Sequence, residues 1–126
     1  MELRETAKTW IEMWNLDVDD PEREKYEWVD DYEYEVVYEN PDKALDLVLE
    51  ILKQPISNRT KEVLAAGPLE QVLAVHGSKI ILRVEKLARN NAIFANLLGG
   101  VWQNSMSEEV WERVQSVCVR KGWDGN

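Results

Sequence analysis

Two side chains in the sequence are of the types that could act as an acid–base pair: the carboxylate of Glu70 and the imidazole of His76, the single histidine. Both lie in GPLEQVLAVHG (67–77), which reads as one small helix with Pro68 at its first position. At about 100° per residue the two side chains would lie about 240° apart, so they would not share a face. Glu70 could instead cap the helix start, with His76 in the last turn before a left-handed Gly77. We therefore expect no catalytic residue here.

Other reactive residues lack the neighbours that their chemistry needs. Cys118 is the only cysteine, so no disulfide can form within the chain and no multi-cysteine zinc site is expected. Its apolar neighbours at helical spacing indicate a core thiol rather than a nucleophile. The double glycine Gly99–Gly100 is not followed by the GK[ST] of a phosphate loop, and no serine lies in a GxSxG motif. The sequence predicts a protein that is not an enzyme and has no cofactor.

A local excess of carboxylates is the strongest chemical feature. The segment from Asp17 to Asp46 holds 13 acidic and three basic residues, whereas the rest of the chain holds 11 acidic and 12 basic ones, for a net charge of -9. Phosphate contacts need Lys and Arg, so a nucleic-acid partner is not expected. The acidic stretch DVDDPEREKYEW lacks the glycine and the ligand spacing of a calcium loop, so no metal site is expected either.

The rotation of a helix over 21–39 would separate this segment into two faces. Val29, Tyr32 and Val36 fall on one side, and the opposite side collects carboxylates and tyrosines. Like-charged neighbours four residues apart on such a helix each cost about 0.2–0.5 kcal/mol. Carboxylates pair with Lys and Arg, and tyrosine gives contact area at low entropic cost. We predict that this outward side binds a basic protein; the alternative is that it is only a solvated face. We call this side the acidic tyrosine face. It consists of Glu27, Asp30, Asp31, Tyr34, Glu35 and Tyr38.

Helix signals in the first half come from caps and periodicity. Residues 2–15 carry apolar side chains at the spacing of an amphipathic helix. Asp20 before Pro21 and Asn40 before Pro41 each combine an N-cap with a first-position proline, and predict helix starts there. The stretch YEYEVVYE (32–39) alternates as a strand would, but a lone strand would leave its backbone groups unpaired. Helix is favoured there, and the choice between helix and strand stays open.

Further helices are expected over 58–66, 68–76, 80–88, 94–98 and 107–121. Gly99 would stop one of them in the left-handed conformation, and Ser107 would cap the next, with Met106 and Trp111 forming a hydrophobic staple around it. A chain of 126 residues suits a single core. The fold class predicted is all-α: one compact domain (1–126) of about six to eight consecutive antiparallel helices, with a short stack of helical hairpins as one arrangement.

Basic side chains are predicted to form a stripe along the helix over 80–88 and the residue just before it: Lys79, Arg83 and Lys86. This stripe could meet the acidic helix of the same molecule or of a second copy, or contact RNA, which is the weakest of the three. The N-terminus has no signal-peptide core, and no apolar run of 18 residues occurs. The sequence thus predicts a cytoplasmic protein that does not contact membranes.

Four motifs occur in a fixed order along the second half: GPLE (67–70), HG (76–77), LLGGVW (97–102) and VWERV (110–114). As a set, best over residues 65–114, they resemble a bacterial family of small domains of unknown function. In the first half only NPDKALDLVLEIL (40–52) matches that family. The resemblance implies a shared helical fold and a bacterial source, and it carries no activity.

Size and charge, without any motif, also resemble the immunity proteins that neutralise secreted bacterial toxins. The leading hypothesis is therefore a cytoplasmic immunity protein whose acidic tyrosine face occludes a basic toxin domain, such as a nuclease. The second is a helical adaptor, regulatory protein or homodimer, in which the basic helix of one copy meets the acidic helix of its mate. The third is an enzyme that uses Glu70 and His76.

Overall fold

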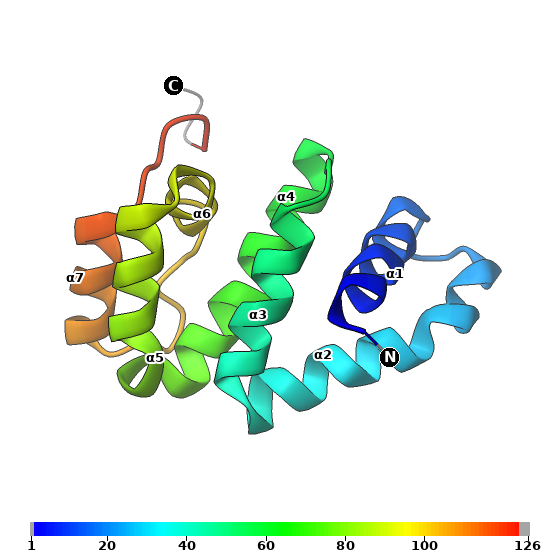
Figure 1. Cartoon of the computed structure of the whole chain (residues 1–126), viewed down its shortest axis with the longest axis horizontal. Helices are drawn as coiled ribbons and strands as arrows, with labels where there is room; N and C mark the ends of the chain where they lie inside the picture. The colour runs from blue at the N-terminus through cyan, green and yellow to red at the C-terminus, as the bar shows by residue number, and fades with distance from the viewer. Residues whose placement is uncertain (1, 124–126) are drawn as a thin grey trace.

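The computed structural model describes residues 2–123, and every regular element in that range is helical (Figure 1). A 3-10 helix over Pro21–Tyr26 leads into the second α-helix, and a π-helical segment over Ala65–Leu69 joins the fourth to the fifth. The α-helices are α1 (Leu3–Asn15), α2 (Glu27–Glu39), α3 (Pro41–Leu52), α4 (Asn58–Leu64), α5 (Glu70–Asn90), α6 (Ala92–Leu98) and α7 (Glu108–Val117). The all-α prediction is confirmed, and the ambiguous residues 32–39 are helical, as part of α2.

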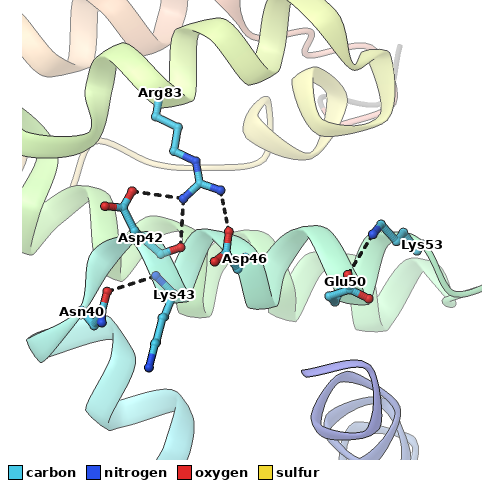
Figure 2. A network of polar contacts seen from close by, with 7 residues as sticks. All are labelled: Asn40, Asp42, Lys43, Asp46, Glu50, Lys53 and Arg83. Carbon is cyan, nitrogen blue, oxygen red and sulfur yellow. Dashed lines mark hydrogen bonds and ion pairs between the residues drawn. The ribbon is translucent and has the colours of Figure 1, made fainter. Parts of the chain in front are cut away.

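The predicted caps at the helix starts are confirmed. The side chain of Asp20 accepts a hydrogen bond from the Glu22 N–H at 2.9 Å. Asn40 accepts one from the Lys43 N–H at 3.2 Å (Figure 2). The Ser107 hydroxyl caps α7 in the same way, because it accepts a hydrogen bond from the Val110 N–H at 3.2 Å. Each cap satisfies a backbone donor that the first helical turn leaves free, which is why these local signals were sufficient.

Helices that are neighbours in the chain are not always neighbours in the fold. α1 packs chiefly against α3, while α2 runs beneath α1 and meets α3 at a sharp corner (Figure 1). α5 packs against α7, α6, α3 and α2, so it joins the two ends of the molecule. One core results, and its largest fully buried side chains include Trp10, Leu45, Ile51, Leu73, Ile81 and Phe94.

α5 continues through the point where the sequence predicted an end. The predicted break between 68–76 and 80–88 is a bend at His76 (φ -125°, ψ 17°) inside one helix. The prediction of a left-handed Gly77 is wrong, because among the described residues only Asn104 and Gly122 have positive φ. Gly77 is buried, and a Cβ there would lie 2.9 Å from Val110 Cγ1 of α7. This glycine lets two helices approach closely.

Gly99 also has a different role from the one predicted. Its backbone is right-handed (φ -63°, ψ -18°), so the predicted left-handed stop is wrong. A Cβ on Gly99 would overlap the carbonyl oxygen of Val119, because residues 119–123 cross directly over the end of α6. We call residues 119–123 the strap. The Val119 N–H donates to the Ala95 carbonyl at 2.9 Å, which fixes the strap to α6.

Gly100 is covered by the other end of the strap. A Cβ on Gly100 would lie 2.5 Å from Cη2 of Trp123, so the indole ring rests on the bare glycine. The Trp123 Nε1–H donates to the Asn96 carbonyl at 2.6 Å, and the Lys61 ammonium lies 5.0 Å from the ring centroid. The strap therefore packs directly against the two glycines, where a side chain would leave no room for it.

Candidate functional site

The two residues of the hypothetical acid–base pair face different partners. Glu70 Oε1 accepts from the Trp102 N–H at 2.8 Å, and Glu70 Oε2 accepts from Asn104 Nδ2 at 3.2 Å. His76 Nε2 lies 3.0 Å from the Tyr38 carbonyl oxygen, to which it donates. The expectation that Glu70 caps its own helix is wrong, because its carboxylate holds the loop before α7. The structure does not bring Glu70 and His76 into one site.

All six residues of the acidic tyrosine face are exposed, as the helical rotation predicted. Val29, Val36 and Val37 form the buried side of α2. Tyr34 is 68% exposed, and Tyr38 is 38% exposed. Their ring centroids lie 4.6 Å apart at an interplanar angle of 39°, so the two rings form one aromatic surface. Binding of a partner at this face stays a prediction.

None of the carboxylates of this face forms an ion pair in the part of the chain that the structure describes. None of Glu27, Asp30, Asp31 and Glu35 lies within 4.0 Å of a Lys, Arg or His nitrogen there. The aspartates of α3 differ. Asp42 and Asp46 both pair with a cation of the same molecule.

Arg83 is the cation that pairs with the two aspartates of α3. Its guanidinium reaches from α5 to Asp42 Oδ1 at 3.1 Å and to Asp46 Oδ1 at 2.5 Å, and it also donates to the Asp42 carbonyl at 3.0 Å (Figure 2). The predicted basic stripe thus meets acidic residues of the same molecule on α3 and not on α2. Lys79 and Lys86 of the stripe are exposed.

Four residues of the face border one hollow. Asp30, Asp31, Tyr34 and Tyr38 surround a hollow of about 350 Å³ that is completed by Glu33, Val37 and Gln71. Glu27 borders a neighbouring hollow together with Asp30. Glu35 does not line the hollow. The structure therefore brings together four of the six predicted residues and adds Gln71 of α5, which sequence analysis did not find.

Glu33 is the most unusual carboxylate at this hollow. It is half-buried, and its Oε1 accepts from the Trp10 Nε1–H at 2.6 Å. Burial raises the pKa of Glu33, the indole bond opposes the rise, and the charge of Asp30 adds to it. Sequence analysis missed Glu33, although a signal was present. It lies four residues from both Val29 and Val37, on the buried side of α2.

Glu33→Gln is expected to stabilise the fold at neutral pH more than at pH 4. Because the pKa of Glu33 lies above its ordinary value of 4.5, the folded chain holds this proton more tightly than the unfolded chain. The wild type therefore loses stability as the pH rises from 4.5 through the raised pKa. Glutamine keeps an acceptor for the indole and has no charge to desolvate.

Urea unfolding of wild type and Glu33→Gln at about pH 4 and about pH 7 measures this difference. The exposed Glu35→Gln is the matched control, because it removes the same charge from α2 without a buried carboxylate. A stability difference for Glu33→Gln that does not grow with pH beyond that of the control would contradict the assignment.

Neither a metal centre nor a membrane span is evident over residues 2–123. No group of three or more His, Cys, Asp and Glu side chains in this range is arranged to hold a metal ion. No helix in it is long and apolar enough to cross a membrane.

Comparison with known proteins adds one finding. The model of a family of unknown function matches residues 17–122, which confirms the resemblance to a small domain of unknown function and extends it over the acidic segment. No curated protein and no solved structure matches the chain.

Proposed function

The chain belongs to DUF6869, a family of unknown function, and we propose that it is a non-enzymatic protein that binds and neutralises a basic toxin domain. In this proposal it is the immunity protein of a bacterial toxin and acts in the cytoplasm. The contact surface is the acidic tyrosine face of α2. The observation that carries the proposal is that four exposed carboxylates lie beside two exposed tyrosines without a cation to pair with.

Repulsion along α2 supports a binding role. The like-charged pairs of Glu27 with Asp31 and of Asp31 with Glu35 each cost the free helix about 0.2–0.5 kcal/mol. A surface helix needed only for solubility could carry mixed charges and avoid this cost. Lys and Arg of a basic partner would remove the repulsion, and the excess negative charge would speed encounter with that partner.

The hollow at the face suits a long basic side chain. The rings of Tyr34 and Tyr38 give an apolar and cation-attracting surface beside the carboxylates of Asp30 and Asp31. A Lys or Arg side chain can lay its aliphatic part along the rings and direct its charge to the carboxylates. Such a contact would place the basic cleft of a toxin, for example a nuclease, directly against α2.

The alternative is a homodimeric or adaptor protein. Leu82 is 73% exposed on α5, on the same stripe as the exposed Lys79 and Lys86, so this stripe combines apolar and basic contacts. It could bind the acidic tyrosine face of a second copy. Sedimentation velocity separates the two functions, because a chain that stays monomeric at high concentration and low salt is not a homodimer of this kind.

Reversing two charges on α2 tests the proposal. The Asp31→Lys, Glu35→Lys double variant is expected to weaken binding to the basic toxin domain that this proposal places in a neighbouring gene by at least about tenfold, because two attractive charges become repulsive. Isothermal titration calorimetry gives the Kd, and growth of a bacterial host that produces both proteins reports neutralisation. The matched control is Glu62→Lys, Glu112→Lys, which changes the net charge equally at exposed positions on α4 and α7.

The control variant should bind and protect as the wild type does. Equal protection by the α2 variant would remove the acidic tyrosine face from the contact surface. A wild-type chain that neither binds the toxin domain nor protects the host would overturn the proposed function itself.

A further inference from the structure

The loop between α6 and α7 exposes a large aromatic side chain. Trp102 is 72% exposed, although Val101 before it is 1% exposed and Met106 after it is 6% exposed. The loop is thus fixed to the core on both sides of Trp102, while the indole itself fills no space inside the protein. The Trp102 side chain is turned to solvent.

Hydrogen bonds hold this loop in one shape. Both oxygens of Glu70 bind it, through the Trp102 N–H and the Asn104 side chain. Asn104 adopts a left-handed backbone with φ 51°. Gln103 Nε2 donates to the Met106 carbonyl at 3.4 Å and to Glu108 Oε1 at 3.3 Å. A side chain presented from a fixed loop loses little entropy when it binds, and tryptophan is enriched among the residues that dominate binding energy at protein interfaces.

Two carboxylates contact this loop. Glu70 lies against it from α5, and Glu108 contacts it from the start of α7. An exposed indole on a loop that carboxylates contact suits a guanidinium group, which stacks on the ring and donates hydrogen bonds in its plane. An arginine stacks on a tryptophan elsewhere in this chain, where the Arg23 guanidinium carbon lies 4.4 Å from the Trp14 ring centroid.

We infer that Trp102, together with Glu70 and Glu108, which contact its loop, is a second contact site that binds an arginine side chain of the basic partner protein. The inference rests on the proposed function, because that function supplies a basic partner. The site is built from α5, the loop before α7 and α7 itself, and it shares no residue with the acidic tyrosine face. Arginine is favoured over lysine because only the planar guanidinium can stack on the indole.

A peptide titration tests the site without the toxin. Hexaarginine and hexalysine peptides are added in turn to the whole ¹⁵N-labelled chain, and the indole N–H cross-peak of Trp102 is assigned by its loss in Trp102→Phe. The expected result is a saturable shift of this cross-peak that is larger with hexaarginine than with hexalysine. The shift should persist in the Asp31→Lys, Glu35→Lys variant. A cross-peak that stays in place, or that moves equally with both peptides, overturns the inference.

A second experiment measures binding to the toxin domain. Trp102→Ala is expected to raise its Kd by about tenfold, whereas Leu82→Ala, a matched control at a residue exposed to the same extent on α5, leaves the Kd unchanged. Binding by Trp102→Ala as tight as that of the wild type overturns the inference and leaves the proposed function standing. If the wild-type chain does not bind the toxin domain, the proposed function fails, and the peptide titration alone decides whether Trp102 binds arginine.

Discussion

Replacing Trp10 with alanine is expected to lower the free energy of unfolding by about 3–5 kcal/mol. Trp10 is fully buried between α1 and its neighbours, so its removal leaves a large cavity in the core. It also removes the indole N–H that the half-buried Glu33 accepts at 2.6 Å. A buried carboxylate without a donor adds to the loss. Because domains of this kind have only about 5–15 kcal/mol of stability, the variant should be close to unfolding.

Urea unfolding at neutral pH measures this effect. Trp102→Ala is the matched control, because it removes the same side chain from a position that is 72% exposed, and it should change stability by no more than about 0.5 kcal/mol. Trp10→Phe keeps most of the apolar volume but removes the donor, so it should cost less than Trp10→Ala. A Trp10→Ala variant as stable as the control would contradict the described core.

Gly99→Ala is expected to destabilise the fold by about 1–3 kcal/mol. The new methyl group would overlap the carbonyl oxygen of Val119, and backbone cannot move aside as a flexible side chain can. The strap would have to lift from α6 and lose the bond from the Val119 N–H to Ala95. The right-handed backbone of Gly99 suits alanine, which by itself would stabilise by about 0.4–1 kcal/mol. A destabilised variant would therefore show that the steric effect dominates.

Gly100 provides the comparison within the same corner. Its added methyl group would meet the ring of Trp123, so Gly100→Ala should destabilise the wild type but have little effect when Trp123→Ala is already present. Thermal unfolding of the four chains in this cycle measures the coupling. Gly99→Ala should destabilise the Trp123→Ala chain as much as it destabilises the wild type, because its added methyl group would meet Val119. Equal couplings for the two glycines would argue against the described path of the strap.

The helix starts could be predicted from the sequence because each depends on a few adjacent residues. Asp20, Asn40 and Ser107 all cap the helix that follows them, as their side-chain chemistry indicates. The outer face of α2 was also predictable, since rotation along a helix fixes which side chains share a face. Its hollow was not predictable, because Gln71 comes from a helix far along the chain.

The roles of Gly77, Gly99 and Glu70 were predicted wrongly because the residues that they contact lie far away in the sequence. A glycine is required either by positive φ or by the close approach of another segment, and the sequence around Gly77 and Gly99 does not distinguish the two. Here the neighbours are Val110 and Val119. Glu70 matched a local capping pattern, but its acceptor oxygens are satisfied by the loop that carries Trp102.

The unpaired carboxylates of α2 give dissolved salt two opposite effects on this protein. In the free chain, cations screen the repulsion between successive turns and should stabilise the fold. In a complex with a basic partner, the same screening weakens the attraction across the interface. At physiological ionic strength the Debye length is about 8 Å, close to the spacing of about 6 Å between neighbouring side chains on a helix. Raising the ionic strength is therefore expected to stabilise the free chain and to weaken the proposed complex.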